Sequence, residues 1–311
     1  MELKRSRKEK GMIELATMSS VCPDWSLDEI IAAMKRHGYR GLEPRVEWGH
    51  ACGIEADMSP DQRRETHRRM QDEGLDICCI ATGVRMAEPE EEKRAQYIED
   101  LKRHIDLAAD LGCRLVRTFG GQRARDREWQ YVVDYVVEGY GEVVSFAEER
   151  GVIVLIETHD DWCSSPPVRA VVEQVGHAHL KVLWDFMHTQ RVLEKPCESF
   201  SMLAEHVAHL HAHDGQYVEG KMQVGALGEG AIDHQIPLRL LREAGFAGYF
   251  SVEVIHKVDA GADFITTQLF FDNLFTNPEV SKSLLHNDFT FSWMGIIEQG
   301  GVLWNKDNLF D

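Results

Sequence analysis

The stretch VIVLIETHDDW, residues 152–162, decides the fold that we predict for this chain. Five consecutive apolar residues lead to Glu157, and His159 and two aspartates follow. A run of this composition is typical of a parallel strand that is buried on both faces. A carboxylate at the end of such a strand needs a partner, because an isolated charge is costly to remove from water. The rest of the chain must therefore supply that partner.

A short apolar run followed by a longer amphipathic run recurs along the whole chain. Ser26 and Glu29 form a capping-box pattern where one predicted helix begins, and Gly38 marks its end. The predicted strands are 12–18, 41–45, 75–82, 113–120, 152–157, 181–186, 207–214 and 249–255. The predicted helices are 26–38, 59–74, 90–111, 128–150, 166–176, 197–206 and 233–245. Eight strands alternating with helices over about 250 residues predict an α/β fold, the single-domain (β/α)8 TIM barrel.

The main alternative is a doubly wound open sheet. No Gly-x-Gly-x-x-Gly pattern follows the first predicted strand to support it. No linker rich in Pro, Gly or Ser divides the chain, so we expect one TIM-barrel domain over residues 12–275. Residues 276–311 are an atypical C-terminal extension of unclear role. Its aromatic and aliphatic side chains could cover the barrel base or a subunit interface, the latter in a homo-oligomer.

Charge and cysteine usage limit the partners and the compartment. The net charge is −18, from 34 basic and 52 acidic residues, which opposes binding to nucleic acid. No segment approaches the eighteen consecutive apolar residues of a membrane span, and the basic start lacks a secretory-signal pattern. The seven cysteines are scattered without a C-x-x-C pair, as expected for buried free thiols in a reducing compartment. We therefore expect a cytoplasmic protein that binds a small molecule, and neither membrane nor nucleic acid.

Carboxylates and imidazoles gather at the ends of the late strands. They are Glu157, Asp185, Glu253 and, on one face of strand 207–214, His209, His211 and His213. In a TIM barrel the strand C-termini form one rim, where active sites lie. Carboxylates crowded there would be desolvated and repel one another, a cost that a divalent cation removes. Oxygen and nitrogen ligands without thiolate favour Mn²⁺, and also suit Mg²⁺ or Co²⁺. The alternative is a separate ion pair or helix cap for each residue.

Five motifs on these segments resemble one known group of barrels. IETHDDW, WDFMHT, HLHAHDG, GEGAID and FSVEV resemble the xylose isomerase-like barrel superfamily, in its sugar phosphate isomerase/epimerase branch, over residues 12–257. The resemblance implies metal ligands at Glu157, Asp185, His211 and Glu253, with His213 as the second choice of histidine. It also implies that His188 binds substrate. Several ketose epimerases of this group have an arginine where this chain reads GQYVEGK, so the substrate need not be one of theirs.

The resemblance implies a metal-dependent isomerase or epimerase that acts on a sugar or related polyol ketone through an enediolate. Glu157 and Glu253 would be the catalytic residues, one removing a proton and the other returning one. If a β-hydroxyl leaves instead, the protein is a dehydratase (a lyase) of the inosose or dehydroshikimate type. A DNA-repair endonuclease of a related barrel family is opposed by the −18 charge. A barrel that only binds ligands would leave the four convergent residues unexplained.

Three further residues are candidates for contact with substrate. His50 lies in the polar loop EPRVEWGHACG (43–53), which could cover the site or simply be solvated. Arg117 could bind an anionic or polyol ligand, or pair with the carboxylates. Trp162 could stack on a sugar face, or only pack in the core.

One segment does not fit the barrel pattern. KVDAGADFITTQLFFDNLF (257–275) is similar, over residues 257–272, to a motif of methylenetetrahydrofolate reductase, another barrel. No flavin-binding motif of that family accompanies it, so a flavin-dependent folate reductase is an alternative that this stretch alone suggests. Its β-branched and aromatic content favours a strand, while its apolar spacing also fits a helix.

Overall fold

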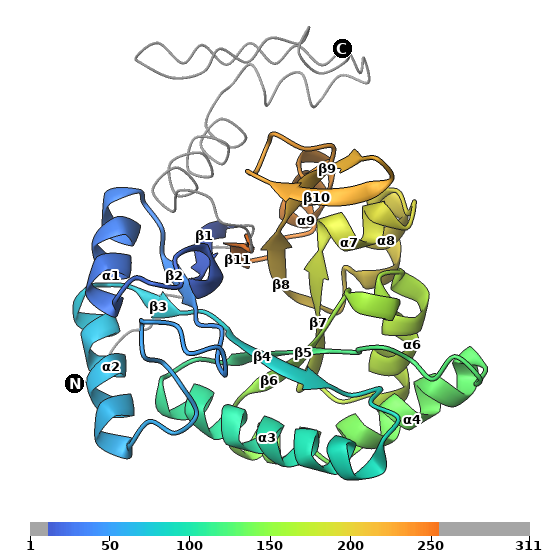
Figure 1. Ribbon diagram of the computed structural model, residues 1–311, viewed down its shortest axis with the longest axis horizontal. Helices are drawn as coiled ribbons and strands as arrows, with labels where there is room; N and C mark the ends of the chain where they lie inside the picture. Colours follow the sequence, from blue (N-terminus) through green and yellow to red (C-terminus); the bar gives the residue numbers. More distant parts are fainter. Residues whose placement is uncertain (1–11, 255–311) are drawn as a thin grey trace, which may run out of the picture.

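A computed structural model describes residues 12–254, and its central feature is one parallel sheet (Figure 1). The strand order is β3-β2-β1-β11-β8-β7-β6-β5-β4, and every ladder in it is parallel. The strands are β1 (Ile13–Met18), β2 (Gly41–Glu43), β3 (Asp76–Ile77), β4 (Ile80–Arg85), β5 (Leu115–Phe119), β6 (Ile153–Glu157), β7 (Leu180–Asp185), β8 (Val207–Ala212) and β11 (Gly248–Val252).

The two ends of this sheet meet and close a barrel. The predicted strand 75–82 is divided in the structure, because β3 pairs with β2 whereas β4 pairs with β5. Beyond β2, Arg45 forms a parallel bridge with Ala81 of β4. The Ala81 amide donates to the Pro44 carbonyl at 2.9 Å, and the Val46 amide donates to the Ala81 carbonyl at 3.0 Å. The predicted TIM barrel is therefore confirmed.

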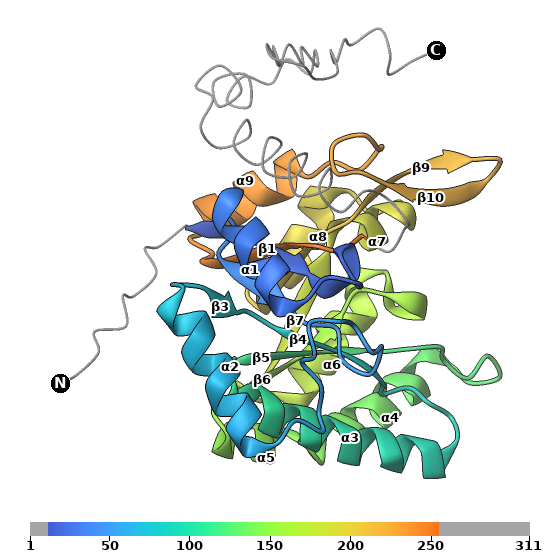
Figure 2. The same ribbon diagram turned by 60° about the vertical axis from the view of Figure 1, so that its left-hand side comes forward.

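Helices lie outside the barrel and connect successive strands (Figures 1 and 2). They are α1 (Leu27–Arg36), α2 (Pro60–Asp72), α3 (Glu91–Asp110), α4 (Trp129–Gly141), α5 (Val144–Glu149), α6 (Ser165–Val175), α7 (Phe186–Arg191), α8 (Pro196–Leu203) and α9 (Gln235–Glu243). The predicted capping box of Ser26 and Glu29 begins α1. No helix among residues 12–254 has both the length and the apolar content to cross a bilayer.

Besides the divided strand, four further details differ from the sequence predictions. The helix predicted over 128–150 is broken after Gly141 into α4 and α5. The short helix α7 follows β7 directly, because the Asp185 carboxylate accepts hydrogen bonds from the amides of Met187 and His188. The hairpin β9 (Asp214–Val218) and β10 (Lys221–Gly225) was also missed, and the predicted extension of strand 207–214 ends at Ala212. Strand residue 255, the segment 257–275 and the tail 276–311 lie outside the described residues.

Alternation along the strands separates two cores. On β6, Val154 and Ile156 belong to the large core between barrel and helices, while Leu155 faces the barrel interior. The interior residues form a small apolar layer, which we call the barrel floor: Ala16, Cys78, Cys79, Leu155, Leu183 and Tyr249. Gly41 leaves room for this layer, since a Cβ there would lie 2.8 Å from a ring carbon of Tyr249. One step along the strands from the floor, the interior becomes polar.

Candidate metal centre and active site

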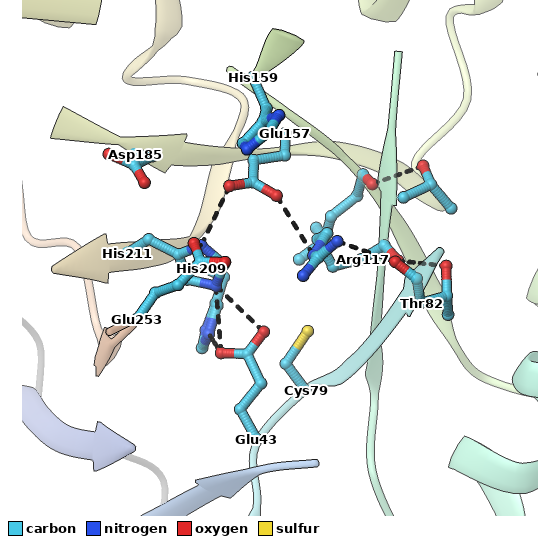
Figure 3. A network of polar contacts seen from close by, with 12 residues as sticks. Glu43, Cys79, Thr82, Arg117, Glu157, His159, Asp185, His209, His211 and Glu253 are labelled. Atoms are coloured by element: carbon cyan, nitrogen blue, oxygen red, sulfur yellow. Dashed lines mark hydrogen bonds and ion pairs between the residues drawn. The ribbon is translucent and has the colours of Figure 1, made fainter. Parts of the chain in front are cut away.

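The four predicted metal ligands lie together inside the barrel, one strand step beyond the floor. Glu157 and Asp185 end β6 and β7, His211 lies in β8, and Glu253 directly follows β11. Parallel pairing places Asp185 opposite His211, and His211 opposite Ser251. The four side chains are at most 1% exposed, and each offers a ligand atom within 4.8 Å of the others. Figure 3 shows Glu157, His211 and Glu253 converging on one region, with Asp185 beside them.

His211 is at the centre of these contacts. Its Nδ1 atom lies 2.8 Å from Glu253 Oε2 and 3.1 Å from Glu157 Oε1. Burial alone would lower the pKa of His211, but the carboxylates of Glu43, Glu253 and Glu157 raise it well above its ordinary value. Burial alone would likewise raise the pKa of Glu253, but His211 and its neighbours hold that pKa well below the usual range. When no cation is bound, the protonated His211 ring and the surrounding carboxylates therefore stabilise each other.

Arg117 lies beneath the cluster rather than at the rim. It is fully buried, its Nε lies 3.2 Å from Glu157 Oε2, and its Nη1 donates to the Thr82 carbonyl at 2.8 Å (Figure 3). Burial alone would lower the pKa of Arg117, but Glu157, Glu253 and Glu43 raise it. Of the two roles expected for this residue, the geometry favours ion pairing with the carboxylates.

The donor set suits a divalent cation. Three carboxylates and one imidazole, all buried and without thiolate, form the group, which matches metals that prefer oxygen and nitrogen ligands. Within the described residues, Glu157 Oε2 and Glu253 Oε2 meet the ion-pair partners Arg117 Nε and His211 Nδ1 but accept no well-aligned hydrogen bond. Three carboxylates buried this close together repel one another, and a cation would remove that cost.

A second layer of imidazoles surrounds Asp185. His213 Nδ1 lies 3.2 Å from Asp185 Oδ2, and His188 Nε2 lies 3.6 Å from the same oxygen. The His188 ring contacts His159 edge-on, with ring centroids 4.2 Å apart. Burial, reinforced by His159 and His213, lowers the pKa of His188 well below its ordinary value, so this ring is neutral at pH 7. The Nε2 atoms of His188 and His213 are buried without a hydrogen-bond partner in the described part of the chain, so both can bond a substrate oxygen.

The other two predicted contact residues, His50 and Trp162, have their contacts with residues outside the group of four ligands. His50 is half-buried and its Nδ1 lies 2.8 Å from Ser19 Oγ. Trp162 is fully buried, lies against Gly120 and contacts the Trp129 ring edge-on at 5.3 Å. This environment favours the packing role of Trp162 over stacking on a sugar.

Glu43 belongs to the site but was not among the predicted site residues. It lay where the predicted strand 41–45 and the polar loop 43–53 overlap; in the structure it ends β2, is fully buried and points into the barrel (Figure 3). Its carboxylate lies 2.9 Å from His209 Nε2 and 3.1 Å from His211 Nε2. The alternation of Gly41 and Glu43 on one strand face was the available signal.

Comparison with known proteins agrees with this architecture. The family model described as xylose isomerase-like TIM barrel matches residues 31–273. A curated 3-dehydroshikimate dehydratase of Bacillus anthracis is 25% identical over 190 residues, which cover 60% of this chain and 65% of that protein. An uncharacterized protein of Methanocaldococcus jannaschii is 22% identical over 139 residues, covering 44% of this chain and 54% of that protein. The matched segments thus span less than two thirds of either relative.

Solved structures share the fold at low identity. The structure of IOLI protein with a binding zinc atom superposes with a TM-score of 0.74 at 19% identity, over 87% of this chain and 99% of that one. An L-ribulose 3-epimerase superposes with a TM-score of 0.72 at 17% identity, over 89% of this chain and 99% of that one. A probable 3-dehydroshikimate dehydratase of Bacillus anthracis superposes with a TM-score of 0.69 at 20% identity, over 84% of this chain and 99% of that one. The resemblance of residues 257–272 to methylenetetrahydrofolate reductase gains no support from these comparisons, and those residues lie outside the described part.

Proposed function

Because the chain belongs to the xylose isomerase-like TIM barrel family, we propose that it is a divalent-metal-dependent isomerase or epimerase of a small sugar or polyol ketone. The observation that carries this proposal is the convergence of Glu157, Asp185, His211 and Glu253 within 4.8 Å at the C-terminal end of the barrel. A bound cation, with Mn²⁺ as our first choice, would polarise substrate oxygens and acidify the adjacent C–H bond. The relatives with named sugar-isomerising and dehydrating activities support this class of chemistry.

The chain's own residues suit the proton transfers. Glu157 ends β6 and Glu253 follows β11, so the two carboxylates reach the site from separate strands. One carboxylate would remove a proton next to the carbonyl, which leaves an enediolate, and the other would return a proton. Return to the opposite face of the same carbon gives an epimer, whereas return to the neighbouring carbon gives the aldose or ketose isomer. Neutral His188 would form a hydrogen bond with a substrate oxygen from the side of Asp185.

The test is metal content followed by proton exchange. The purified chain should hold about one equivalent of divalent metal, lose it to a chelator and regain it on Mn²⁺ addition. With a panel of ketoses and inososes in deuterated water, the metal-loaded protein should introduce deuterium beside the carbonyl of its substrate. Glu157→Gln should abolish exchange, while Glu194→Gln, which removes a carboxylate that ties Ser165 to Ser199, should not. Failure to take up any divalent metal would overturn the proposal.

A dehydratase acting on a carboxylate-bearing substrate is the second candidate, and Arg45 favours it. This half-buried guanidinium stacks on Trp48 at 3.7 Å and has no carboxylate at ion-pair distance among residues 12–254. Burial and Arg117 lower its pKa while Glu253 and Glu157 oppose them, which places Arg45 in the field of the cluster. An unpaired arginine there, in a chain of charge −18, suits an anionic substrate group.

In the dehydratase reaction, a carboxylate would remove the proton next to the carbonyl and pass it to the β-hydroxyl, which would leave as water as the C=C bond forms. The test is incubation with 3-dehydroshikimate, monitoring the new ultraviolet absorption of the aromatic product. Arg45→Ala should raise KM for such an acid and leave any activity on neutral ketoses unchanged. Turnover of neutral ketoses alone, with the acid inert, would reject this candidate.

A further inference from the structure

Glu43 lies on the far side of His211 from the other carboxylates. Glu43 is fully buried, and its two oxygens lie 3.1 and 3.2 Å from His211 Nε2. The opposite ring nitrogen, Nδ1, faces Glu253 and Glu157 at 2.8 and 3.1 Å. The two nitrogens of one imidazole thus meet carboxylates from different strands, β2 on one side and β6 and the end of β11 on the other (Figure 3).

This geometry gives the two ring nitrogens of His211 different roles. A histidine that binds a cation through one nitrogen must present a lone pair there, and its other nitrogen then carries the proton. Only Nδ1 faces the proposed ligands Glu157 and Glu253, so Nε2 is the nitrogen that donates, and Glu43 is its acceptor. A carboxylate behind a metal-binding histidine fixes the tautomer and the ring orientation and increases the basicity of the ligand.

His209 completes the arrangement from the same strand. Its Nε2 lies 2.9 Å from Glu43 Oε2, and its Nδ1 has no hydrogen-bond partner within the described residues. His209 therefore donates through Nε2, and Glu43 receives one N–H from each of two buried rings. Two donors hold the Glu43 carboxylate in place, and their rings lie 5.8 Å apart at 77°. Removing His209 would take from Glu43 Oε2 the shorter of its two contacts and leave His211 Nε2, at 3.2 Å, as its donor.

We propose that Glu43 is a positioning residue of the metal centre, which accepts the Nε2 proton of His211 and thereby holds Nδ1 toward Glu157 and Glu253. This inference rests on the proposed metal-dependent function. His209 acts one contact farther away, by anchoring Glu43. The same three residues, Glu43, His209 and His211, also have ligand atoms within 4.8 Å of one another, so the competing possibility is a second cation between them.

The test uses metal affinity and spectroscopy rather than turnover. Glu43→Gln keeps the side-chain shape and should weaken Co²⁺ or Zn²⁺ binding by about 10–100-fold in a chelator competition. The visible spectrum of the Co²⁺-loaded variant should shift, because the ligand field changes when His211 reorients. Glu194→Gln is the matched control, since it removes a hydrogen-bonded carboxylate between α6 and α8 and should leave both readouts unchanged. Thermal unfolding of the metal-free proteins separates loss of fold from loss of affinity.

A double-mutant comparison shows whether Glu43 acts through His211. In a His211→Ala background, Glu43→Gln should have no further effect on the residual metal affinity. Equal losses in both backgrounds, or unchanged affinity and spectrum in Glu43→Gln alone, would overturn the assignment. Binding of two equivalents of metal by the unmodified chain, with one lost in Glu43→Gln, would overturn it in favour of a second cation. An unmodified chain that binds no metal would reject the proposed function and this inference together, whereas the preceding outcomes reject only the inference.

Discussion

The floor and the polar layer of the barrel interior are built from the same strands but from side chains of opposite chemical character. Leu155 and Glu157 are two residues apart on β6, as are Leu183 and Asp185 on β7, so each pair shares the inward face. The floor is apolar and thiol-rich, whereas the layer one step beyond it carries carboxylates and imidazoles. A two-residue step thus separates packing from the proposed chemistry, and the two layers should respond differently to substitution.

The largest effect is expected in the polar layer. Glu157→Gln removes a proposed ligand and proton-transfer group, so turnover should fall by about 10²–10⁴-fold, with metal content below one equivalent. The far-UV circular dichroism spectrum should stay unchanged, since the substitution preserves volume. Steady-state kinetics and elemental analysis measure the two losses. Full activity with full metal content would remove Glu157 from the site.

A substitution in the floor should lower stability and leave metal binding nearly unchanged. Leu155→Ala deletes a fully buried side chain and should lower the free energy of unfolding by about 2–5 kcal/mol. Urea denaturation of the metal-free protein measures this loss. The variant, held at a temperature where it is folded, should still bind one equivalent of metal with nearly unchanged affinity. A large loss of metal affinity would show that the two layers are not independent.

Lowering the pH should weaken metal binding by the polar layer. The pKa of His211 is raised well above its ordinary value by Glu43, Glu253 and Glu157, so the metal-free ring holds its extra proton at pH 7. A cation must displace that proton, and metal affinity should therefore rise with pH by up to about tenfold per unit until the raised pKa is passed. Calorimetry in buffers of different ionisation enthalpy should detect about one proton released per ion. A pH-independent affinity with no proton release would contradict the His211 contact.

The smallest effect concerns access to the thiols. Six of the seven cysteines are buried and Cys197 is exposed. Burial raises the pKa of Cys22 and of Cys113 to about 12, which leaves almost no thiolate at neutral pH. A thiol reagent should therefore label one cysteine in the native protein and seven in denaturant. Rapid native labelling of Cys78 or Cys79 would show that the floor opens.

The repeated strand and helix pattern predicted the fold because each element carries its own local signal. Capping residues and short, nearly continuous apolar runs were sufficient for β1, α1 and β6. Local signals failed where tertiary contacts decide, as in the break between β3 and β4, where the chain changes neighbours to close the barrel. The hairpin that we missed turns at Glu219 and Gly220, which both adopt positive φ, as in type I′ turns. Gly220 was the sequence signal for this turn.

Glu157, Asp185 and Glu253 could be chosen from the sequence because each lies at or near the end of a strand that the repeat itself identifies, whereas the family resemblance selected His211 among three histidines. Glu43 also ends a predicted strand, but its contact with His211 could not be inferred in this way. Its partners His209 and His211 lie on β8, three places away from β2 in the sheet order and more than 160 residues away in sequence. Which interior groups meet across a closed barrel depends on its registers, and no local pattern encodes them.

The ladder between β1 and β11 also sets the order of events during synthesis. It joins residues 13–17 to residues 248–252, so about 240 residues must leave the ribosome before it can form. At about 5–20 residues per second, roughly 12–48 s pass while β1 waits for this partner. Glu253 follows that last strand, so the nascent chain acquires its complete set of proposed ligands only as the barrel closes. A cellular metal-delivery system would therefore meet an incomplete site on every nascent chain from which Glu253 has not yet emerged.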